Sequence, residues 1–428
     1  MVPIECEDDS VTKLTRGQLI ARAGAAATTV ALGHAEPVTA APDLRDWSAV
    51  RSQFLLDPAR IHLASFLLAA HPRPVRSAIE RHRRRLDADP VTYLHANEAR
   101  LTGSARAAAA RFLGVPSEEV ALTDSTTMGL GLLYTRLALR PGEEVLTTEH
   151  DFYATHEALR LSGLRVRRIR LYDDPRGASV DEIVERLRRG VSGRTRVLAV
   201  TWVHSSTGVK LPLAEIAGAL PERVLLCVDG VHGFGVDAST IPELRFDALA
   251  SGCHKWLYGP RGTGILWAGN RIRQLLRPTI PSFDDPASHG AWLSGTAPTG
   301  TPDGARLTPG GFHSFEHRWA LTEAFRFHEQ IGRRRVETRV RSLARRLQSG
   351  LSEVKGVRLR TPVADAVSAG LVCFEVAGVA PDEVVRRLAA RRIVASVTPY
   401  AQRYVRLGPG IVNSPADADA AVRSIAAL

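Results

Sequence analysis

Lysine is rare in this chain, and one lysine stands where covalent chemistry is feasible. Of the 56 basic residues only four are lysines, Lys13, Lys210, Lys255 and Lys355, and the rest are arginines. Arginine stays protonated in proteins, whereas lysine can lose its proton and act as an amine nucleophile. Lys255 follows a short apolar run and precedes the glycine-rich turn GPRGTG at 259–264. It is a candidate for an imine with a carbonyl cofactor, although a lysine taken alone is more commonly a solvated surface residue.

A carboxylate and an imidazole follow a second apolar run. Asp229 ends the run RVLLCVD, and His232 comes three residues later in VDGVHGFG. At the carboxyl end of a parallel strand Asp229 would face the ligand crevice, where it could keep the ring nitrogen of a pyridoxal cofactor protonated. His232 could reach the phenolic oxygen of the same cofactor. The alternatives are a turn aspartate before Gly230 and a hydrogen-bonded loop histidine.

Two further segments complete a possible cofactor site. In TDSTTMGLGLL, Ser125, Thr126 and Thr127 precede an apolar helical run, and such a helix N-terminus suits a phosphate. Alone, the same residues are no more than a good helix cap. In TTEHDFYATH, His150 follows a strand, where its ring could stack on a flat heterocycle.

Apolar runs alternate with helical patterns after Asp46, which predicts an α/β fold with a mostly parallel, helix-covered sheet. The predicted strands are 120–123, 144–148, 165–171, 197–203, 223–229, 248–252 and 264–268, with helices at 74–88, 96–113 and 181–191. Residues 285–311 are rich in Gly, Pro, Ser and Thr, which is typical of a loop. A helix over 315–353, a strand over 369–376, a helix near 381–391 and a strand over 403–409 predict a smaller α+β domain. We expect a leader over 1–46, a large domain over 47–285, and a loop with a small C-terminal domain over 286–428.

Composition and charge narrow the classes of function. With 44% apolar and 24% charged residues, the chain has the make-up of a folded protein. The net charge of +11 comes from arginine runs at 81–89, 165–174 and 332–346 that are interleaved with acidic or apolar residues. This spacing favours solvated faces over a phosphate-binding surface, so we expect no nucleic-acid partner. The four cysteines, Cys6, Cys227, Cys253 and Cys373, suggest neither a disulfide framework nor a metal site.

The first 46 residues resemble a degenerate export signal. Basic residues precede an Ala-rich run from Ala23 to Leu32, which is too short to cross a bilayer, so no membrane span is expected. TRGQLI is close to a twin-arginine motif, but Gly17 stands where the second arginine belongs. We expect a cytoplasmic protein, with export through a twin-arginine-like signal as the alternative.

Together these motifs resemble the class V aminotransferase family, which consists of fold type I enzymes that use pyridoxal 5′-phosphate (PLP). The blocks that carry the resemblance are SGCHKW…GPRGTG and VDGVHGFG, and the matching stretch runs from about residue 47 to 428. The segments at 61–83, 201–212 and 307–321 look like the isopenicillin-N-epimerase-like branch. Within that branch they are similar to the exported PLP enzymes of pyoverdine side-chain tailoring.

The resemblance implies a role for each matching residue. Lys255 would be the Schiff-base lysine, Asp229 the partner of the pyridine nitrogen, His150 the stacking ring and His232 the neighbour of the phenolic oxygen. Thr126, Thr127, Ser251 and His254 would hold the phosphate. Arg406 in YVRLGPG matches the arginine that binds the substrate α-carboxylate, and Thr308 in LTPGG matches a loop that reaches the phosphate of the neighbouring subunit. A homodimer that acts on a small amino acid or a peptide-linked side chain is therefore expected.

The sequence defines the shared machinery better than the reaction. Transamination-type chemistry, with Lys255 as the proton shuttle, is the leading interpretation. A C–S lyase or an epimerase is the alternative, and an inactive PLP-binding homologue is the non-enzymatic one. Cysteine desulfuration through a persulfide is disfavoured, because Cys373 lies in the alternating apolar run AGLVCFEV, and Cys227 and Cys253 also occupy strand positions.

Overall fold

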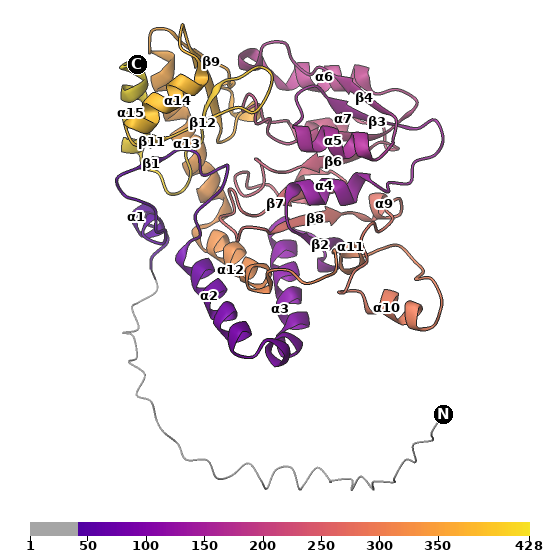
Figure 1. The fold of residues 1–428 in the computed structure, drawn as a ribbon. Coiled ribbons are helices and arrows are strands. Elements are labelled where there is room, and N and C mark those ends of the chain that lie inside the picture. The colour runs from indigo at the N-terminus through magenta and orange to yellow at the C-terminus, as the bar shows by residue number, and fades with distance from the viewer. Residues whose placement is uncertain (1–41) are drawn as a thin grey trace, which may run out of the picture. The chain divides into compact units, whose positions relative to one another are not determined.

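The seven predicted strands of the large domain form one sheet. A computed structural model describes residues 42–428, and its largest sheet has the order β2-β8-β7-β6-β5-β3-β4 (Figure 1). The strands are β2 (Val120–Thr123), β3 (Glu144–Thr148), β4 (Val166–Ile169), β5 (Thr195–Thr201), β6 (Leu225–Asp229), β7 (Ala248–Gly252) and β8 (Gly264–Ala268). Only the two pairs made by β8 are antiparallel, and the other four are parallel. The prediction of a mostly parallel sheet is confirmed.

The apolar runs are continuous because both faces of this sheet are covered. Side chains alternate along a strand, so Leu226 and Val228 of β6 join one hydrophobic cluster while Leu225 and Cys227 join the other. Each cluster also contains side chains of helices, so helices pack on both faces of the sheet. Strand β4 lies at the edge of the sheet, where Arg167 and Arg168 reach solvent. Because both faces are buried, nearly every residue of a central strand is apolar, and the strands can be recognised in the sequence as short continuous apolar runs.

The three helices predicted in this half, 74–88, 96–113 and 181–191, are present as α2 (Arg73–Ala88), α3 (Pro90–Leu113) and α6 (Val180–Gly190). The others, for which no range was predicted from the sequence, are α1 (Trp47–Arg51), α4 (Thr126–Tyr134), α5 (Tyr153–Leu161), α7 (Leu213–Ala219), α8 (Ile241–Leu244) and α9 (Asn270–Arg273). Helix α3 begins six residues earlier than expected, because Asp89 caps it by accepting a hydrogen bond from the Thr92 amide at 3.2 Å. Pro90 at the first helical position reinforces this start.

The C-terminal part has its own sheet and its own core. Its antiparallel sheet has the order β12-β13-β10-β9, and β1 (Ile61–His62) pairs separately with β11 (Ile393–Val394). The strands are β9 (Val357–Leu359), β10 (Val372–Val376), β12 (Ser396–Val397) and β13 (Val405–Leu407), with helices α13 (Arg333–Ser352), α14 (Pro381–Ala390) and α15 (Pro415–Ala426) beside them. A third hydrophobic cluster joins these elements. The exact domain boundaries stay a prediction.

Two predictions in this half are wrong. The helix expected over 315–353 is two helices, α12 (Phe315–Ile331) and α13, because Gly332 between them has a φ of 94°, outside the helical region. The segment expected as a loop contains two short helices, α10 (Pro286–Leu293) and α11 (Gly304–Leu307). Asp285 and Asp303 cap them, and polar composition alone did not reveal those caps.

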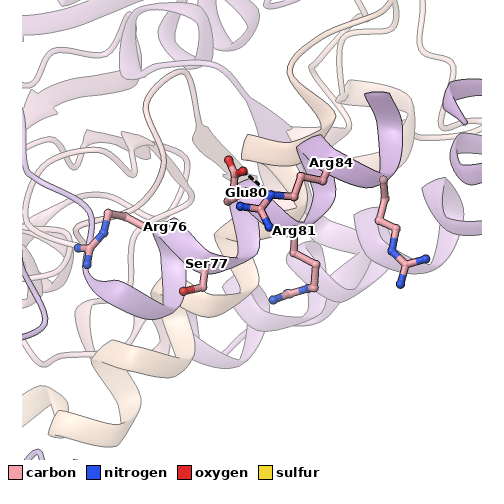
Figure 2. A pocket seen from close by; sticks show the side chains of 6 residues that line it. Arg76, Ser77, Glu80, Arg81 and Arg84 are labelled. Atoms are coloured by element: carbon pink, nitrogen blue, oxygen red, sulfur yellow. Dashed lines mark hydrogen bonds and ion pairs between the residues drawn. The ribbon is translucent and has the colours of Figure 1, made fainter. Parts of the chain in front are cut away.

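The arginine runs form ion pairs and exposed faces. On α13, Arg345 pairs with Asp365 and Arg346 with Asp419. On α2, a hollow of about 440 Å³ is lined by Arg76, Ser77, Glu80, Arg81, Arg84 and Arg85, and Arg84 forms an ion pair with Glu80 (Figure 2). Hydrogen bonds from Arg83 and Arg84 lower the pKa of Glu80 to about 2.

The sequence raises two further questions, whether the N-terminal segment is an export signal and whether any helix spans a membrane. Residues 1–41 lie outside the described residues, so the leader and the location of the protein stay predictions. Among the helices of residues 42–428, none has both the length and the apolar character to cross a bilayer.

Gly235 tests how tightly the segment after β6 is packed. Its φ is 85°, and a Cβ there would lie 2.8 Å from the Leu257 amide nitrogen and 2.9 Å from the Trp256 carbonyl carbon. Gly163 has a similar φ of 71° but no atom near the same position. We expect Gly163→Ala to lower the free energy of unfolding by about 1 kcal/mol through backbone strain alone. Gly235→Ala should lower it by about 3 kcal/mol, because overpacking adds to the strain.

Denaturant unfolding of both variants measures this difference. Equal losses for the two would show that the backbone after Lys255 yields to the added methyl group.

Candidate active site

A cavity of about 160 Å³ lies at the carboxyl ends of the parallel strands, where the sequence placed the ligand crevice. It is lined by Leu67, Ser125, Thr126, Thr127, Phe152, Ala154, Ser205, Asp229, Val231, His232, His254, Lys255, Pro399 and Arg406. Most of these residues lie at or after the ends of β2, β3, β5, β6 and β7. Leu67 lies between β1 and α2, Pro399 lies in the loop between β12 and β13, and Arg406 belongs to β13. Eight of the predicted site residues are therefore brought together: Ser125, Thr126, Thr127, Asp229, His232, His254, Lys255 and Arg406.

Asp229 is the last residue of β6 and is almost fully buried. Its Oδ1 accepts a hydrogen bond from the Val231 amide at 3.0 Å, and its Oδ2 accepts one from the Thr155 hydroxyl at 3.3 Å. Burial raises the pKa of Asp229 to about 6, although both hydrogen bonds and Lys255 oppose that rise. At neutral pH the carboxylate is thus ionised and able to hold a protonated ring nitrogen.

Lys255 stands three residues past the end of β7, the strand that pairs with β6. Burial lowers the pKa of Lys255 to about 8, and the charge of Asp229 limits the decrease. An ordinary lysine has a pKa of about 10.4, so Lys255 has a far larger fraction of free amine at neutral pH. This is the property required of an amine nucleophile.

The tautomer of His232 is set by its neighbour. The Trp256 indole N–H donates to His232 Nδ1 at 3.3 Å, so a neutral ring carries its proton on Nε2. Burial holds the pKa of His232 well below its usual value, which keeps the ring neutral. The side chain therefore offers an N–H donor to the cavity, as a phenolic oxygen requires.

The start of α4 provides an anion site. Ser125 caps the helix by accepting from the Met128 amide at 3.1 Å, and the Thr126 hydroxyl accepts from the Gly252 amide at 2.7 Å. Because Thr126 is used as an acceptor, its own proton is left to donate. His254 lines the same cavity, and its buried Nδ1 has no hydrogen-bond partner. This donor set, an orphaned ring nitrogen included, fits the phosphate of the predicted PLP cofactor.

Arg406 of β13 contributes a buried cation to the other side of the cavity. One terminal nitrogen donates to the Ser205 carbonyl at 3.0 Å, Nε donates to Ser396 Oγ at 3.2 Å, and the guanidinium lies 4.7 Å from the Phe66 ring centre. Within residues 42–428 no carboxylate pairs with it, and burial lowers its pKa. An unpaired buried guanidinium is a binding site for an anion, and the second terminal nitrogen remains available for a carboxylate.

Three predicted site residues do not line the cavity. The His150 ring stacks on the Tyr172 ring, with centres 3.9 Å apart, and its Nε2 accepts from the Leu171 amide at 3.1 Å. Ser251 is fully buried and donates to the Gly252 carbonyl at 3.3 Å. The contacts of both are with the protein itself, and their roles toward a cofactor stay predictions.

Thr308 is the third. Its hydroxyl accepts from the Leu122 amide at 3.1 Å and donates to the Gly304 carbonyl at 2.7 Å. The side chain is only 1% exposed. These contacts lie within the chain itself, and the reach of the LTPGG loop to the phosphate of a neighbouring subunit stays a prediction.

Sequence reasoning missed several residues that line the cavity. Phe152 and Ser205 lie inside the motifs TTEHDFYATH and TWVHSSTG. In the first motif only His150 was predicted to be a site residue, and in the second no single residue was. The Phe152 ring meets the Tyr400 ring at 5.8 Å, and the Tyr400 hydroxyl lies 2.8 Å from Ser205 Oγ. Leu67 and Pro399 gave no signal, because apolar loop residues carry no mark of chemistry.

The described cysteines do not line this cavity. Cys227, Cys253 and Cys373 are fully buried, none lines the cavity, and burial raises the pKa of each thiol. A nucleophilic thiol needs a lowered pKa and access to the substrate. These three residues lack both.

Comparisons with known proteins agree with this geometry. The sequence matches the family Aminotransferase class-V over residues 69–398. It is 30% identical to isopenicillin N epimerase of Amycolatopsis lactamdurans over 342 residues, which cover 77% of this chain and 84% of that protein. It is 27% identical to a probable cysteine desulfurase of Xylella fastidiosa over 340 residues, which cover 75% of this chain and 78% of that protein.

The fold also matches a solved structure. C-DES with glycine covalently linked to its PLP cofactor superposes with a TM-score of 0.78 at 21% identity, covering 88% of this chain and 98% of that one. The predicted fold class and family are confirmed, and the chain belongs to the class V aminotransferase family.

Proposed function

We propose that this protein is a PLP-dependent enzyme that binds an amino acid, free or peptide-linked, and moves the proton on its α-carbon. The observation that carries the proposal is the charge pattern of the cavity. The described lining residues include two basic side chains, the half-buried Lys255 and the buried Arg406, and one carboxylate, that of Asp229. Such a site favours a phosphate and a substrate carboxylate.

Each polar group of the cofactor has a candidate partner in the cavity. Asp229 would hold the proton of the ring nitrogen, the His232 Nε2–H would meet the phenolic oxygen, and Lys255 would bind the aldehyde carbon. Ser125, Thr126, Thr127 and His254 would hold the phosphate. When bound, PLP supplies an electron sink that weakens the bonds at the α-carbon of an amino acid.

The protein's own residues then decide which bond reacts. Arg406 binds the α-carboxylate, which orients the α-carbon in the same cavity as Lys255. With a pKa of about 8, the Lys255 amine can accept the α-proton and return it. Phe152, Leu67 and Pro399 line the cavity with apolar surface, which limits water beside the reacting carbon.

Transamination-type chemistry is the proposed outcome. The other titratable lining residues are engaged elsewhere, because Asp229, His232 and His254 belong to the cofactor side. Lys255 is thus the one proton carrier that the described part of the cavity offers to the substrate. A single carrier can take a proton and return it on one face of the substrate, whereas inversion by two bases needs a second carrier on the opposite face.

Epimerisation and C–S lysis are the second candidates. Similarity to isopenicillin N epimerase and to a probable cysteine desulfurase favours them. The burial of Cys227, Cys253 and Cys373 disfavours a route through a protein persulfide, but a lyase without a catalytic thiol retains this support. The similarity to pyoverdine-tailoring enzymes stays a prediction.

A homodimer is part of the proposal. Large apolar side chains are exposed on and beside the segment that carries α10, namely Phe283, Trp292, Leu293 and Phe312. An exposed apolar group of this size is typical of a surface that meets another chain.

Exchange of the α-proton in heavy water tests the proposed function. The PLP-loaded protein, incubated with a panel of amino acids and small peptides, should place deuterium on the α-carbon of its substrate, as read by mass spectrometry. A keto product indicates transamination, a mirror-image product epimerisation, and a released thiol or sulfide lysis. Lys255→Ala should lower exchange by about 10⁴-fold or more, because it removes the proton carrier.

The control is Lys210→Ala, which removes another half-buried lysine, one that pairs with Asp237 outside the cavity. Exchange that survives Lys255→Ala, or a borohydride-trapped cofactor on another residue, would contradict the role of Lys255.

Arg406→Lys tests the carboxylate site. The variant keeps the charge but loses the planar fork, so kcat/KM for a free amino acid should fall by about tenfold, mainly through KM. Steady-state kinetics measures the change, and Arg403→Lys is the matched control because Arg403 pairs with Asp382 at the surface. Unchanged KM in Arg406→Lys would show that the substrate carboxylate binds elsewhere.

A further inference from the structure

A hydroxyl on α5 holds the carboxylate that ends β6. We propose that Thr155 is a positioning residue that orients Asp229 and keeps it ionised for the pyridine nitrogen of the cofactor. This inference rests on the proposed function, and it assigns a role to a side chain that does not itself line the cavity.

The hydrogen bonds to Asp229 are divided between its two oxygens. Oδ1 accepts from the Val231 amide at 3.0 Å, and Oδ2 accepts from Thr155 Oγ1 at 3.3 Å. Each oxygen thus has one donor from the described chain and keeps a lone pair for a ligand. Removing the Thr155 donor would leave Oδ2 without a protein partner, and the plane of the carboxylate would be fixed from one side only.

Asp151 fixes the start of α5 and therefore the position of Thr155. Asp151 Oδ2 accepts from Thr147 Oγ1 at 2.9 Å, and from the amide and the hydroxyl of Thr148, both at 2.8 Å. Its Oδ1 accepts from the Thr201 amide at 2.6 Å. Thr201 is paired with Asp229 in the register of β5 and β6. The hydrogen bonds of Asp151 therefore connect the start of α5 to β5, the strand beside the Asp229 carboxylate.

The buried surroundings make this hydroxyl important for the charge of Asp229. Burial and the neighbouring carboxylate of Asp151 both raise the pKa of Asp229, whereas Lys255 and the hydrogen bond from Thr155 lower it. The phenols of Tyr134 and Tyr400 also lie near its charge, and they stay neutral because burial raises their pKa values. His232, which lines the same cavity, stays neutral because burial lowers its pKa. Thr155 is therefore the one neutral side chain among the described residues that donates a hydrogen bond to the ionised form.

The direction of the pH effect follows from these contacts. Asp229 must be ionised to accept the proton of the ring nitrogen, and the apo carboxyl takes up a proton as the pH falls through about 6. Cofactor affinity should therefore decrease on the acid side of that value. Without the Thr155 hydroxyl the pKa of Asp229 rises. The decrease in cofactor affinity at low pH, called the acid limb of the binding profile, then moves to higher pH.

Thr155→Val and Thr155→Ser separate the hydroxyl from the shape of the residue. Valine keeps the volume and removes the donor, whereas serine keeps the donor and removes a methyl group. PLP is titrated into each apoprotein across the pH range, and binding is read from the quenching of tryptophan fluorescence. Thermal unfolding of each apoprotein monitors the fold.

Thr155→Val should weaken PLP binding by about tenfold at neutral pH and move the acid limb upward by about one pH unit. Thr155→Ser should keep the acid limb of the wild type. If valine does not allow folding, Thr155→Ala, which also lacks the donor, is held to the same expectation. Wild-type limbs in the variants that lack the donor, or an equal shift in Thr155→Ser, would overturn the role of Thr155 while leaving PLP binding intact. A wild-type protein that does not bind PLP would overturn both this role and the proposed function.

Discussion

The structure depends on two cations, Lys255 and Arg406, that share a buried cavity with a single carboxylate. Taking a charge out of water costs several kcal/mol, and an unpaired buried charge is tolerated where function requires it. Asp229 offsets part of this cost and in turn keeps its own charge at neutral pH. The remaining positive charge has no partner in the described lining. That imbalance favours ligands that bring a phosphate and a carboxylate. Burial, with a smaller contribution from the charge of Arg406, lowers the pKa of Lys255 and leaves part of its amine unprotonated.

Sheet topology is what brings these groups together. Asp229 and Lys255 follow neighbouring parallel strands, β6 and β7, so their carboxyl ends meet at one edge of the sheet. Strands β5 and β3 add Ser205 and Phe152 from the same edge. Arg406 comes from another sheet and donates a hydrogen bond to the Ser205 carbonyl, which joins the C-terminal sheet to the loop after β5. Which residues meet in the cavity is therefore decided by the order of the strands in the sheet more than by their order along the chain.

Features that depend on neighbouring residues, such as strands and the chemistry of a single side chain, could be predicted from the sequence. Apolar runs gave the strands, and the scarcity of lysine together with the position of Asp229 gave the centre of the site. The break at Gly332 was missed because a positive φ is a property of the fold rather than of composition. The orientation of His150 depends on Tyr172 and Leu171, which belong to a different turn, and Thr308 is held by Leu122 from across the chain. Contacts of this kind are long-range and leave no local pattern.

The fold alone does not decide the reaction, because one fold can host many chemistries and the side chains of the site select among them. A route through a protein thiol needs a reactive cysteine beside the substrate, and the described cysteines are buried in strands or directly after one. The loop before Arg406 instead offers Pro399 to the cavity and places the Tyr400 hydroxyl on Ser205, while its ring meets Phe152. These side chains are neutral, so they shape and dry the space around the substrate without supplying a nucleophile. In the proposed function, the choice among reactions would therefore fall to Lys255 and to the orientation that Arg406 would give the substrate.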